Sequence, residues 1–494
     1  MFFVYLTAAC AIFFLFKKYL LFLWSRGVGE FPPGPWPVPV IGNSLQLDRK
    51  KPWETFEKWT LHYGKIFSVL LGDKPTIVVS DLQLIKRAFK DDRFTGRPDS
   101  IWQVLNMDID RGIVLSQGEA WKENRKFTLH ALRDLGFGTS ATQDNIQEEA
   151  RKLLRLLKKS NASPMECRMP FATAASNVIS RVLFGNVFDM EDENLKKFVG
   201  CTAENFCASA RTGLIGLVPW VQYSPPYRGE LQALRNRVTT EITQTQELLD
   251  AHRKSFNPET PRDYIDAFLV AQKTVHKKAY RFTDWDLVCN ISDIHAASTE
   301  TTATFLLWAM IYMIRFPMVQ RKAQMEIDKV VGPHSAITFA DRENLPYVEA
   351  VVHEVFRSSN YGPFLLPHAT IENADFEGFV LPIGTQVIAN AWHVHRDAAL
   401  WKEPEEFDPE RFILPDGQLD KSLLNNVIVF SVGKRVCPGE ILARMEILVF
   451  LGSILQQFTI RSEQEDVVPS LERVNGLALT PHPYRCRFIP RGPE

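Results

Sequence analysis

The residues with the clearest chemical potential lie in a short loop around one cysteine. Residues 430–439 read FSVGKRVCPG and lead into a helical pattern. Cys437 therefore stands at a loop-to-helix junction, where backbone N–H groups and the positive helix end stabilise a thiolate. Gly433 and Gly439 let the backbone approach a flat partner closely, and Arg435 offers a permanently ionised, bidentate donor to a carboxylate. The loop has the chemistry of a thiolate site that also pairs an anion.

Two interpretations of this cysteine are open from the residues alone. A lone cysteine before a helix is most often a buried structural thiol, whereas the same loop can hold heme iron through sulfur while Arg435 pairs a propionate. The whole pattern FxxGxRxCxG, from Phe430 to Gly439, resembles the signature of the cytochrome P450 superfamily. The resemblance implies the P450 fold and heme b as cofactor, with Phe430, Arg435 and Gly439 in the binding loop. It also implies that Cys437 is the axial ligand of the iron.

The resemblance covers nearly the whole chain, and other signature segments follow in the family's order. Glu354–Arg357 resembles the ExxR pair, and Pro409–Phe412 resembles the PERF segment. An ExxR pattern alone is weak, because Glu148–Arg151 also fits it and would be a solvated helix face. Together with Arg411, the ExxR pair would form the family's triad of mutually compensated buried charges, which is structural rather than catalytic.

A further segment, Trp121–Arg125, resembles the family's WxxxR pattern. Its i, i+4 spacing places Trp121 and Arg125 on one helix face. By resemblance both side chains hydrogen-bond the heme propionates, joined by Arg435 and by His368. A loop histidine satisfied by its protein neighbours is the alternative for His368.

The helical pattern from Asp284 to Arg315 contains Ala296–Thr302, which resembles the family's oxygen-binding stretch, AGx(D/E)T. Glu300 and Thr301 would form the catalytic pair there, because an acid followed by an alcohol can relay protons through water for O–O cleavage. Polar helix surface is the alternative. Ser298 stands where the family usually has glycine, which leaves the oxygen-site geometry and the coupling efficiency open.

Helical periodicity dominates the chain. Apolar residues at i, i+3, i+4 spacing predict helices over residues 147–159, 229–255, 284–315, 318–331, 345–357 and 440–458. β-prone runs predict short strands over residues 65–71, 76–80, 376–381, 386–390 and 484–489. The fold class is therefore mainly α with minor β (α+β).

Composition excludes several classes of protein. The 494 residues are 45% hydrophobic and 23% charged, which is typical of a globular chain, and the formal net charge of -1 supplies no global field for nucleic acid. The 7 cysteines are scattered without a CxxC pair, which argues against a disulfide scaffold or a zinc site. Since no Gly/Ser linker or repeat follows, residues 44–494 are expected to form one heme-thiolate catalytic domain.

The N-terminus predicts a transmembrane signal-anchor over residues 1–24. Residues 1–16 carry no charge, and the apolar run resumes after Lys17 and Lys18, which can snorkel. A cleaved signal peptide is the alternative, but a basic n-region and a clear cleavage site are missing. The cations all follow the apolar run, which predicts a cytosolic catalytic domain. Residues 25–43 contain five prolines and would be a linker and stiff hinge between anchor and body.

Residues 214–227 combine apolar and aromatic residues with several prolines and are expected to form a loop. Such a surface could dip into a membrane interface, or it could simply pack between helices. Both interpretations stay open.

Among members of the family, the chain resembles animal microsomal forms of the clan that contains family two. The segments that carry this resemblance are residues 31–43, 126–129, 132–135, 300–302 and 476–481. It implies an endoplasmic-reticulum membrane location and electrons from NADPH through NADPH–cytochrome P450 reductase, and it admits cytochrome b5 as a partner. The patch that meets an acidic reductase would comprise Lys122, Lys126, Lys434 and Arg444. Solvated surface charge is the alternative for each.

The implied function is insertion of one oxygen atom of O2 into a lipophilic small molecule. Substrate contacts are expected from residues 100–115, 296–297, 362–366 and 477–479. These segments are mostly apolar, which favours a steroid, terpenoid, fatty acid or xenobiotic. Two alternatives remain: a reductase-independent isomerase or dehydratase, against which the Glu300–Thr301 pair argues, and a non-catalytic heme-binding membrane protein, which only Ser298 favours.

Overall fold

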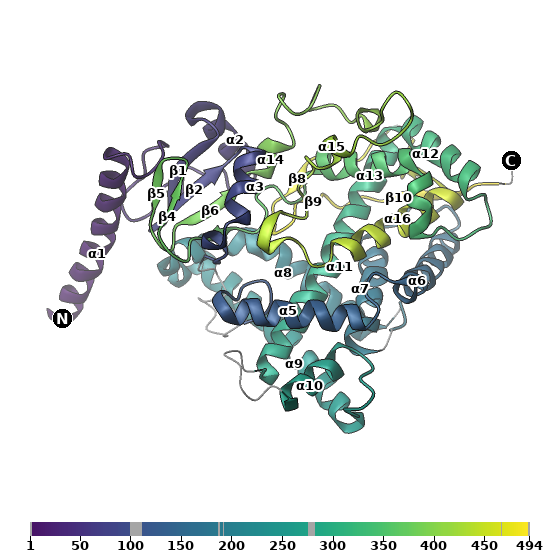
Figure 1. Cartoon of the computed structure of the whole chain (residues 1–494), viewed down its shortest axis with the longest axis horizontal. Helices are drawn as coiled ribbons and strands as arrows, with labels where there is room; N and C mark the ends of the chain where they lie inside the picture. The colour runs from purple at the N-terminus through teal and green to yellow at the C-terminus, as the bar shows by residue number, and fades with distance from the viewer. Residues whose placement is uncertain are drawn as a thin grey trace.

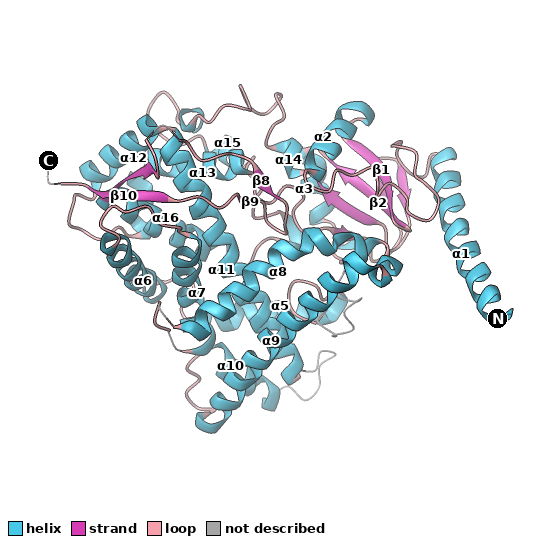
Figure 2. Cartoon of the chain, turned by 180° about the vertical axis from the view of Figure 1, so that it is seen from behind, coloured by secondary structure: helices cyan, strands magenta, loops and turns pink. Residues whose placement is uncertain are grey.

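The computed structural model describes residues 2–98, 111–185, 188–190, 192–274, 282–465 and 467–492. A broad helical body carries a small β-sheet at one end, and the N-terminal helix projects from that end (Figure 1 and Figure 2). The predicted class, mainly α with minor β, is confirmed. Residues 100–110 of the predicted substrate-contact segment lie outside the described residues.

The helices account for most of the described chain. They are α1 (Phe2–Gly27), α2 (Pro52–Tyr63), α3 (Leu82–Lys90), α5 (Gly118–Asp134), α6 (Ser140–Lys159), α7 (Arg168–Phe184), α8 (Glu193–Leu217), α9 (Pro225–Ser255), α10 (Tyr264–Thr274), α11 (Asp284–Arg315), α12 (Pro317–Val330), α13 (Pro346–Ser359), α14 (Ala391–Val394), α15 (Lys421–Leu424) and α16 (Glu440–Gln457). Each predicted helix is present. α6 begins earlier than predicted, because its first turns carry few apolar residues to mark them.

The sheets are small. The largest has the strand order β1-β2-β6-β3. Its strands are β1 (Ile66–Leu71), β2 (Lys74–Val79), β6 (Gln386–Ala389) and β3 (His368–Ala369). β2 pairs parallel with β6, and the other neighbours pair antiparallel. The two-stranded sheets pair β4 (Ala374–Phe376) with β5 (Phe379–Leu381), β7 (Phe458–Ser462) with β10 (Cys486–Pro490), and β8 (Arg473–Val474) with β9 (Thr480–Pro481).

α11 runs through the centre of the helical body and positions the rest. It begins with a capping box in which Thr283 and Asp286 satisfy each other's backbone N–H groups. Its residues are buried nearly all round, and it packs against α7, α13 and α16. Most of its circumference is buried, so its apolar residues extend well beyond a single stripe, and Ala297 is an exposed position near its middle.

The segment after α1 lies along the sheet. The N–H of Ser68 on β1 donates to the carbonyl of Pro33 at 2.9 Å, and the N–H of Leu70 donates to Asn43 Oδ1 at 2.8 Å. The C-terminal part of α1 joins this packing, because Phe22 meets the ring of Phe31 at 5.4 Å between centroids. The proline-rich segment is extended, as its composition predicts, but it packs against the sheet instead of standing free of the rest of the fold.

The anchor over residues 1–24 stays a prediction. Taken singly, none of the helices that the structure describes is long and apolar enough to cross a membrane. α11 and α12 reach that composition only as a pair, and they are bent by 108° at their junction.

Residues 214–227 differ from the predicted loop. Residues 214–217 end α8, a 3-10 helix occupies Pro219–Tyr223, and α9 begins at Pro225. The prolines at 219 and 225 stand at first helical positions, where a missing N–H costs nothing, so they start helices rather than break them. Both sequence interpretations keep support, since Ile215 is buried whereas Tyr223 is 79% exposed.

Candidate heme-thiolate site

The Cys437 loop connects a 3-10 turn, Gly433–Arg435, to α16. The backbone N–H of Cys437 donates to the carbonyl of Phe430 at 2.9 Å, which closes the loop. Burial raises the pKa of the Cys437 thiol, while the backbone N–H of Gly439 and the charge of Arg125 act in the opposite direction. The protein thus surrounds the sulfur with the N–H donor and the cation that an anionic sulfur needs.

Gly433 is required where it stands. Its φ is +78°, and a Cβ there would lie 1.9 Å from the carbonyl oxygen of Phe89 on α3. The ring of Phe89 in turn stacks on His368 with 3.6 Å between ring centroids. The cysteine loop thus packs directly on α3, which packs on β3. This packing leaves no space for a side chain at position 433.

Arg435 is the centre of a buried cationic cluster. Its Nη2 donates to the carbonyls of Thr95 and Ser116 at 2.8 and 2.6 Å, and its Cζ lies 3.8 Å from the ring centroid of Trp121. Burial and the neighbouring guanidinium groups of Arg97 and Arg125 lower the pKa of Arg435 to about 8. Carbonyl and aromatic contacts orient this arginine but do not neutralise it.

Arg97 belongs to the same cluster, and sequence reasoning missed it. Its Nε donates to the carbonyl of Val114 at 3.0 Å and its Nη1 donates to the carbonyl of Pro367 at 2.8 Å. Burial and the charge of Arg125 lower its pKa to about 10. The sequence marks it only as a cation between a glycine and a proline, which indicates a constrained loop but no partner.

The cluster lacks an ion pair within the described part of the chain, although the charge of Asp293 acts on Arg97 from farther away. Among the described residues, none of Arg97, Arg125 and Arg435 lies within ion-pair distance of a carboxylate. The indole N–H of Trp121 is also buried, and none of the described residues accepts a hydrogen bond from it. Uncompensated buried cations are costly unless an anion is bound. The residues present therefore fit a flat dianion such as heme, whose propionates would meet this cluster beside Cys437.

His368 has a protein partner on one side. Its Nδ1 lies 2.8 Å from the carbonyl oxygen of Phe94 and so donates to it. Burial and the charges of Arg97 and Arg435 hold its pKa well below the usual range, so the free ring is neutral and Nε2 carries no proton. Nε2 can donate to a propionate only when the ring is protonated. A nearby carboxylate favours that protonated form. Its contact with a propionate stays a prediction.

The predicted catalytic pair lies on α11. Glu300 Oε2 accepts from Arg168 Nη2 at 2.8 Å, and its Oε1 is buried with no partner among the described residues. Burial raises the pKa of Glu300, and Arg168 opposes that shift. The hydroxyl of Thr301 donates to the carbonyl of Ala297 at 2.6 Å. Ala297 is exposed, and Ala296, Ser298 and Thr301 are half-buried, so solvent reaches this side of α11.

Sequence reasoning also missed Glu446 and Asp293. Glu446 on α16 is buried, accepts from the hydroxyl of Thr302 at 2.8 Å, and has its pKa raised by burial to about 8. Asp293 on α11 accepts from the N–H of Val114 at 2.9 Å, and burial raises its pKa to about 7. Glu446 is signalled by being an acid inside an apolar run of α16, whereas nothing in the sequence pairs Asp293 with the loop at 114.

Glu354, Arg357 and Arg411 form the expected triad of charged side chains. Arg357 binds both oxygens of Glu354 at 2.8 and 2.7 Å, and Arg411 Nε lies 3.2 Å from Glu354 Oε1. The N–H of Asp408 adds a further bond to Glu354 Oε1 at 2.8 Å. All of these groups are used within the protein, which agrees with a structural role.

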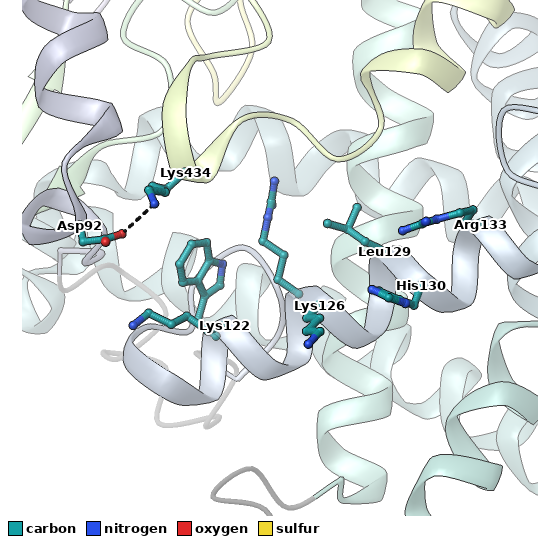
Figure 3. Close-up of a pocket in the computed structure, with 9 residues that line it drawn as sticks. Asp92, Lys122, Lys126, Leu129, His130, Arg133 and Lys434 are labelled. Carbon is teal, nitrogen blue, oxygen red and sulfur yellow. Dashed lines mark ion pairs between the residues drawn. The ribbon is translucent and has the colours of Figure 1, made fainter.

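An open pocket of ≈450 Å³ lies on the surface beside α5 (Figure 3). Its lining residues are Asp92, Trp121, Lys122, Arg125, Lys126, Leu129, His130, Arg133 and Lys434. Asp92 is the one acid among them, and it lies 3.4 Å from Lys434 Nζ. Arg444, which the sequence placed in the same patch, does not line the pocket; Glu440, one turn earlier on α16, binds it at 2.9 Å.

The chain is similar over nearly its whole length to proteins of known family. The family model named Cytochrome P450 matches residues 32–488. The chain is 36% identical over 481 residues to Cytochrome P450 2C21 of Canis lupus familiaris, which covers 95% of this chain and 97% of that protein. It is 36% identical over 507 residues to Cytochrome P450 2C29 of Mus musculus, covering 99% of each. Identity to Cytochrome P450 2J2 of Homo sapiens is 34% over 475 residues, which is 95% of this chain and 93% of that protein.

Proposed function

Because the chain belongs to the cytochrome P450 family and is therefore a monooxygenase built around heme b, we propose that it oxidises a lipophilic small molecule with electrons from NADPH–cytochrome P450 reductase. The observation that carries the proposal is the cluster of buried Arg435 with half-buried Arg97 and Arg125, which lacks a carboxylate ion pair among the described residues and lies beside the Cys437 loop. Cys437 would bind the iron, and the cluster with Trp121 would hold the propionates. When bound, the heme supplies the iron that activates dioxygen.

Proton delivery is assigned to Glu300 and Thr301. Thr301 belongs to the accessible face of α11, so its hydroxyl can give or hold a proton beside the reacting groups. Glu300 has one oxygen held by Arg168 on α7 and one oxygen without a partner among the described residues. That second oxygen would exchange protons with water on the α7 side of the helix.

Exposed apolar side chains in the predicted contact segments support a lipophilic substrate. Ala297 on α11, Leu366 before β3 and Leu477 before β9 are apolar side chains with exposed surface. Leu479, predicted as a contact, is instead buried, and its carbonyl accepts from the indole N–H of Trp308. A steroid, terpenoid, fatty acid or xenobiotic would each satisfy an apolar lining, so the proposal extends to the lipophilic class alone.

The reductase would meet the cationic pocket beside α5. Lys122, Lys126 and Lys434 supply positive charge there, close to the Arg125 side chain that reaches the Cys437 loop. Opposite charges across such a surface steer association and weaken with salt. The double variant Lys122→Glu/Lys126→Glu should raise the KM for reductase about tenfold at low ionic strength, an effect of the size expected for removed steering.

A matched variant separates docking from other causes. Lys58→Glu reverses an exposed charge on α2 and should leave the reductase KM unchanged. Activity supported by an organic hydroperoxide bypasses the reductase and should be equal in all three proteins. If the double variant and Lys58→Glu raise the reductase KM equally, the pocket is not the docking site.

The membrane location follows the N-terminal anchor. Residues 1–24 would hold the protein in the endoplasmic-reticulum membrane, with residues 44–494 on the cytosolic face where the reductase and cytochrome b5 could reach them. The exposed side chains of Trp220 and Tyr223 would add contact with lipid. Carbonate extraction of membranes that contain the full chain should leave it in the pellet, and deletion of residues 2–24 should release it.

The reduced carbon monoxide difference spectrum tests the site itself. Thiolate ligation gives a strongly red-shifted Soret band, so the full chain should show that band and Cys437→Ala should lose it. Cys289→Ala, which alters another buried cysteine, is the matched control and should keep the band. Heme-loaded wild-type protein without the shifted band would overturn the thiolate assignment. A shifted band without NADPH-dependent oxidation of any lipophilic substrate would overturn the monooxygenase mechanism.

A further inference from the structure

Cys167 and Cys486 face each other in the core although they are 319 residues apart in the chain. Their Sγ atoms lie 3.4 Å apart, and both side chains are buried. Cys167 directly precedes α7, and Cys486 is the first residue of β10. Neither thiol belongs to the heme-thiolate site, which uses Cys437.

Backbone pairing holds the two thiols in register. The N–H of Met165 donates to the carbonyl of Cys486 at 2.9 Å, and the N–H of Cys486 donates to the carbonyl of Met165 at 3.1 Å. Side chains from β10 add to this, because Arg485 Nη2 donates to the carbonyl of Pro164 at 2.6 Å and Arg487 Nε donates to that of Ala162 at 3.1 Å. The segment 162–167 is thus fixed along the start of β10.

The remaining gap is small. A disulfide needs about 2.05 Å between sulfurs, so the two atoms have to approach by little more than one ångström. Side-chain rotation supplies a movement of that size. The fixed backbones keep the thiols facing each other instead of letting them drift apart.

Each buried thiol follows an exposed residue in the sequence. Glu166 precedes Cys167 and Arg485 precedes Cys486, and both of these neighbours are exposed. The contact with Cys486 and burial raise the pKa of Cys167, and the charge of Glu166 acts in the same direction. The Cys167 thiol is therefore protonated near neutral pH, and oxidation of the pair depends on the oxidant that is supplied.

We propose that Cys167 and Cys486 are an oxidative modification site that closes to an internal disulfide in the folded protein. The oxidant is a two-electron acceptor such as a peroxide or an azo compound. With hydrogen peroxide, one thiol becomes a sulfenic acid and releases water; the second sulfur attacks it, the S–S bond forms and a second water leaves. Two thiols and one peroxide thus give one disulfide and two waters. The product links the start of α7 to the C-terminal strand.

Peptide mapping of the oxidised holoprotein tests the site. The folded, heme-loaded chain is treated with diamide, whose N=N bond takes the two electrons and two protons, and remaining thiols are then blocked with N-ethylmaleimide. Trypsin releases residues 160–168 (SNASPMECR) and the dipeptide 486–487 (CR). The expected product is these two peptides joined through a disulfide, which dithiothreitol separates. Oxidation should also raise the Tm, because the bond closes a long loop.

Two variants and an internal reference make the result decisive. Cys167→Ser should abolish both the linked peptide and the Tm rise on oxidation, whereas Cys207→Ser should retain both. The half-buried thiol of Cys201 serves as the reference for reagent dose. Recovery of Cys167 and Cys486 as maleimide adducts, at a dose that consumes Cys201, would overturn the proposal. Linkage of either residue to a different cysteine would also overturn it.

Discussion

Glu300 at the centre of α11 and Arg168 at the first position of α7 form an ion pair with 2.8 Å between Oε2 and Nη2. The carboxylate is only 1% exposed, and the guanidinium is 23% exposed. The acid assigned to proton delivery is therefore held from the side of α7, whereas Thr301, its partner in sequence, contacts its own helix. The two groups of the proposed relay are anchored in different ways.

Replacement of Arg168 by leucine should destabilise the protein in a pH-dependent way. Burial already raises the pKa of Glu300, and loss of the opposing guanidinium should raise it further. A group with a raised folded pKa stabilises the fold below its unfolded pKa and loses that contribution as pH rises through the folded pKa. The Tm of Arg168→Leu should thus fall more steeply with rising pH than that of the wild type, with a loss of about 3 kcal/mol at alkaline pH. Thermal unfolding between pH 5 and 9 measures it.

The charge-conserving variant is the control for this pair. Arg168→Lys keeps a cation near Glu300, so its Tm profile should stay close to that of the wild type. Parallel profiles for the leucine variant and the wild type would mean that Arg168 does not set the ionisation of Glu300. If Glu300 also delivers protons as a carboxylate, the acid limb of kcat in Arg168→Leu should move to higher pH.

Glu446→Gln should remove a second pH dependence. Burial raises the pKa of Glu446 to about 8, so its carboxyl is protonated near neutral pH. Its contribution to stability is present at low pH and is lost as pH rises through 8. Glutamine keeps an acceptor for the Thr302 hydroxyl but does not titrate. The variant should match the wild-type Tm at pH 6 and exceed it by several degrees at pH 9.

The comparison variant for Glu446 removes the other partner. Thr302→Val leaves the carboxyl without its hydroxyl donor and should keep a strong fall of Tm with pH. A Glu446→Gln curve that falls as steeply as the wild type would assign the titration to another group.

Asp293→Ala should weaken heme retention indirectly, through Val114 and Arg97. Asp293 binds the N–H of Val114, and the carbonyl of Val114 receives Nε of Arg97. Loss of the carboxyl leaves the half-buried N–H of Val114 without this partner, which costs about 1 kcal/mol, and frees the loop that orients the arginine. Heme per protein and Tm should both fall, which a pyridine hemochrome assay and thermal unfolding measure.

Asparagine at 293 refines this test. Asp293→Asn keeps an oxygen for the Val114 N–H and should restore most of the heme content. Equal heme loss in both variants would show that the charge of Asp293, rather than its bond to the loop, is what the site requires.

Arg97→Met should have opposite effects on the two forms of the protein. In the apoprotein it removes a buried cation that repels Arg125 and Arg435, so the apoprotein Tm should hold or rise. In the holoprotein it removes a charged donor to a propionate, worth about 1.5–3 kcal/mol, so heme should dissociate 10–100-fold faster. Transfer of heme to apomyoglobin gives the rate. Unchanged transfer would place Arg97 outside the propionate site.

Sequence patterns predicted the elements that local periodicity specifies. The spacing of its apolar residues predicts α11, and the resemblance of residues 430–439 to a family signature predicts the Cys437 loop. Residues 214–227 were wrong as a loop, because prolines at first helical positions start a helix as readily as prolines elsewhere end one.

The residues that sequence reasoning missed depend on contacts between distant segments. Arg97 becomes part of the site only because Thr95 and Ser116 both accept from Arg435 of the cysteine loop, and Asp293 matters only because its helix passes Val114. No spacing along the chain encodes such a pairing. Such residues are recognised by a buried charge that has no partner in its own segment. That property can be read only from the structure, because the sequence does not show which charges are buried.

The proline-rich segment also bears on how the protein behaves in solution. β1 lies at the edge of its sheet, where unpaired backbone groups invite another chain to add a strand. Pro33 and Asn43 occupy that edge by bonding to Ser68 and Leu70. The prolines of this segment have no N–H that could pair with an added strand. The segment thus ends the sheet. A chain that lacks residues 1–43 would expose the unpaired edge of β1 and would self-associate through it, even in the absence of any membrane.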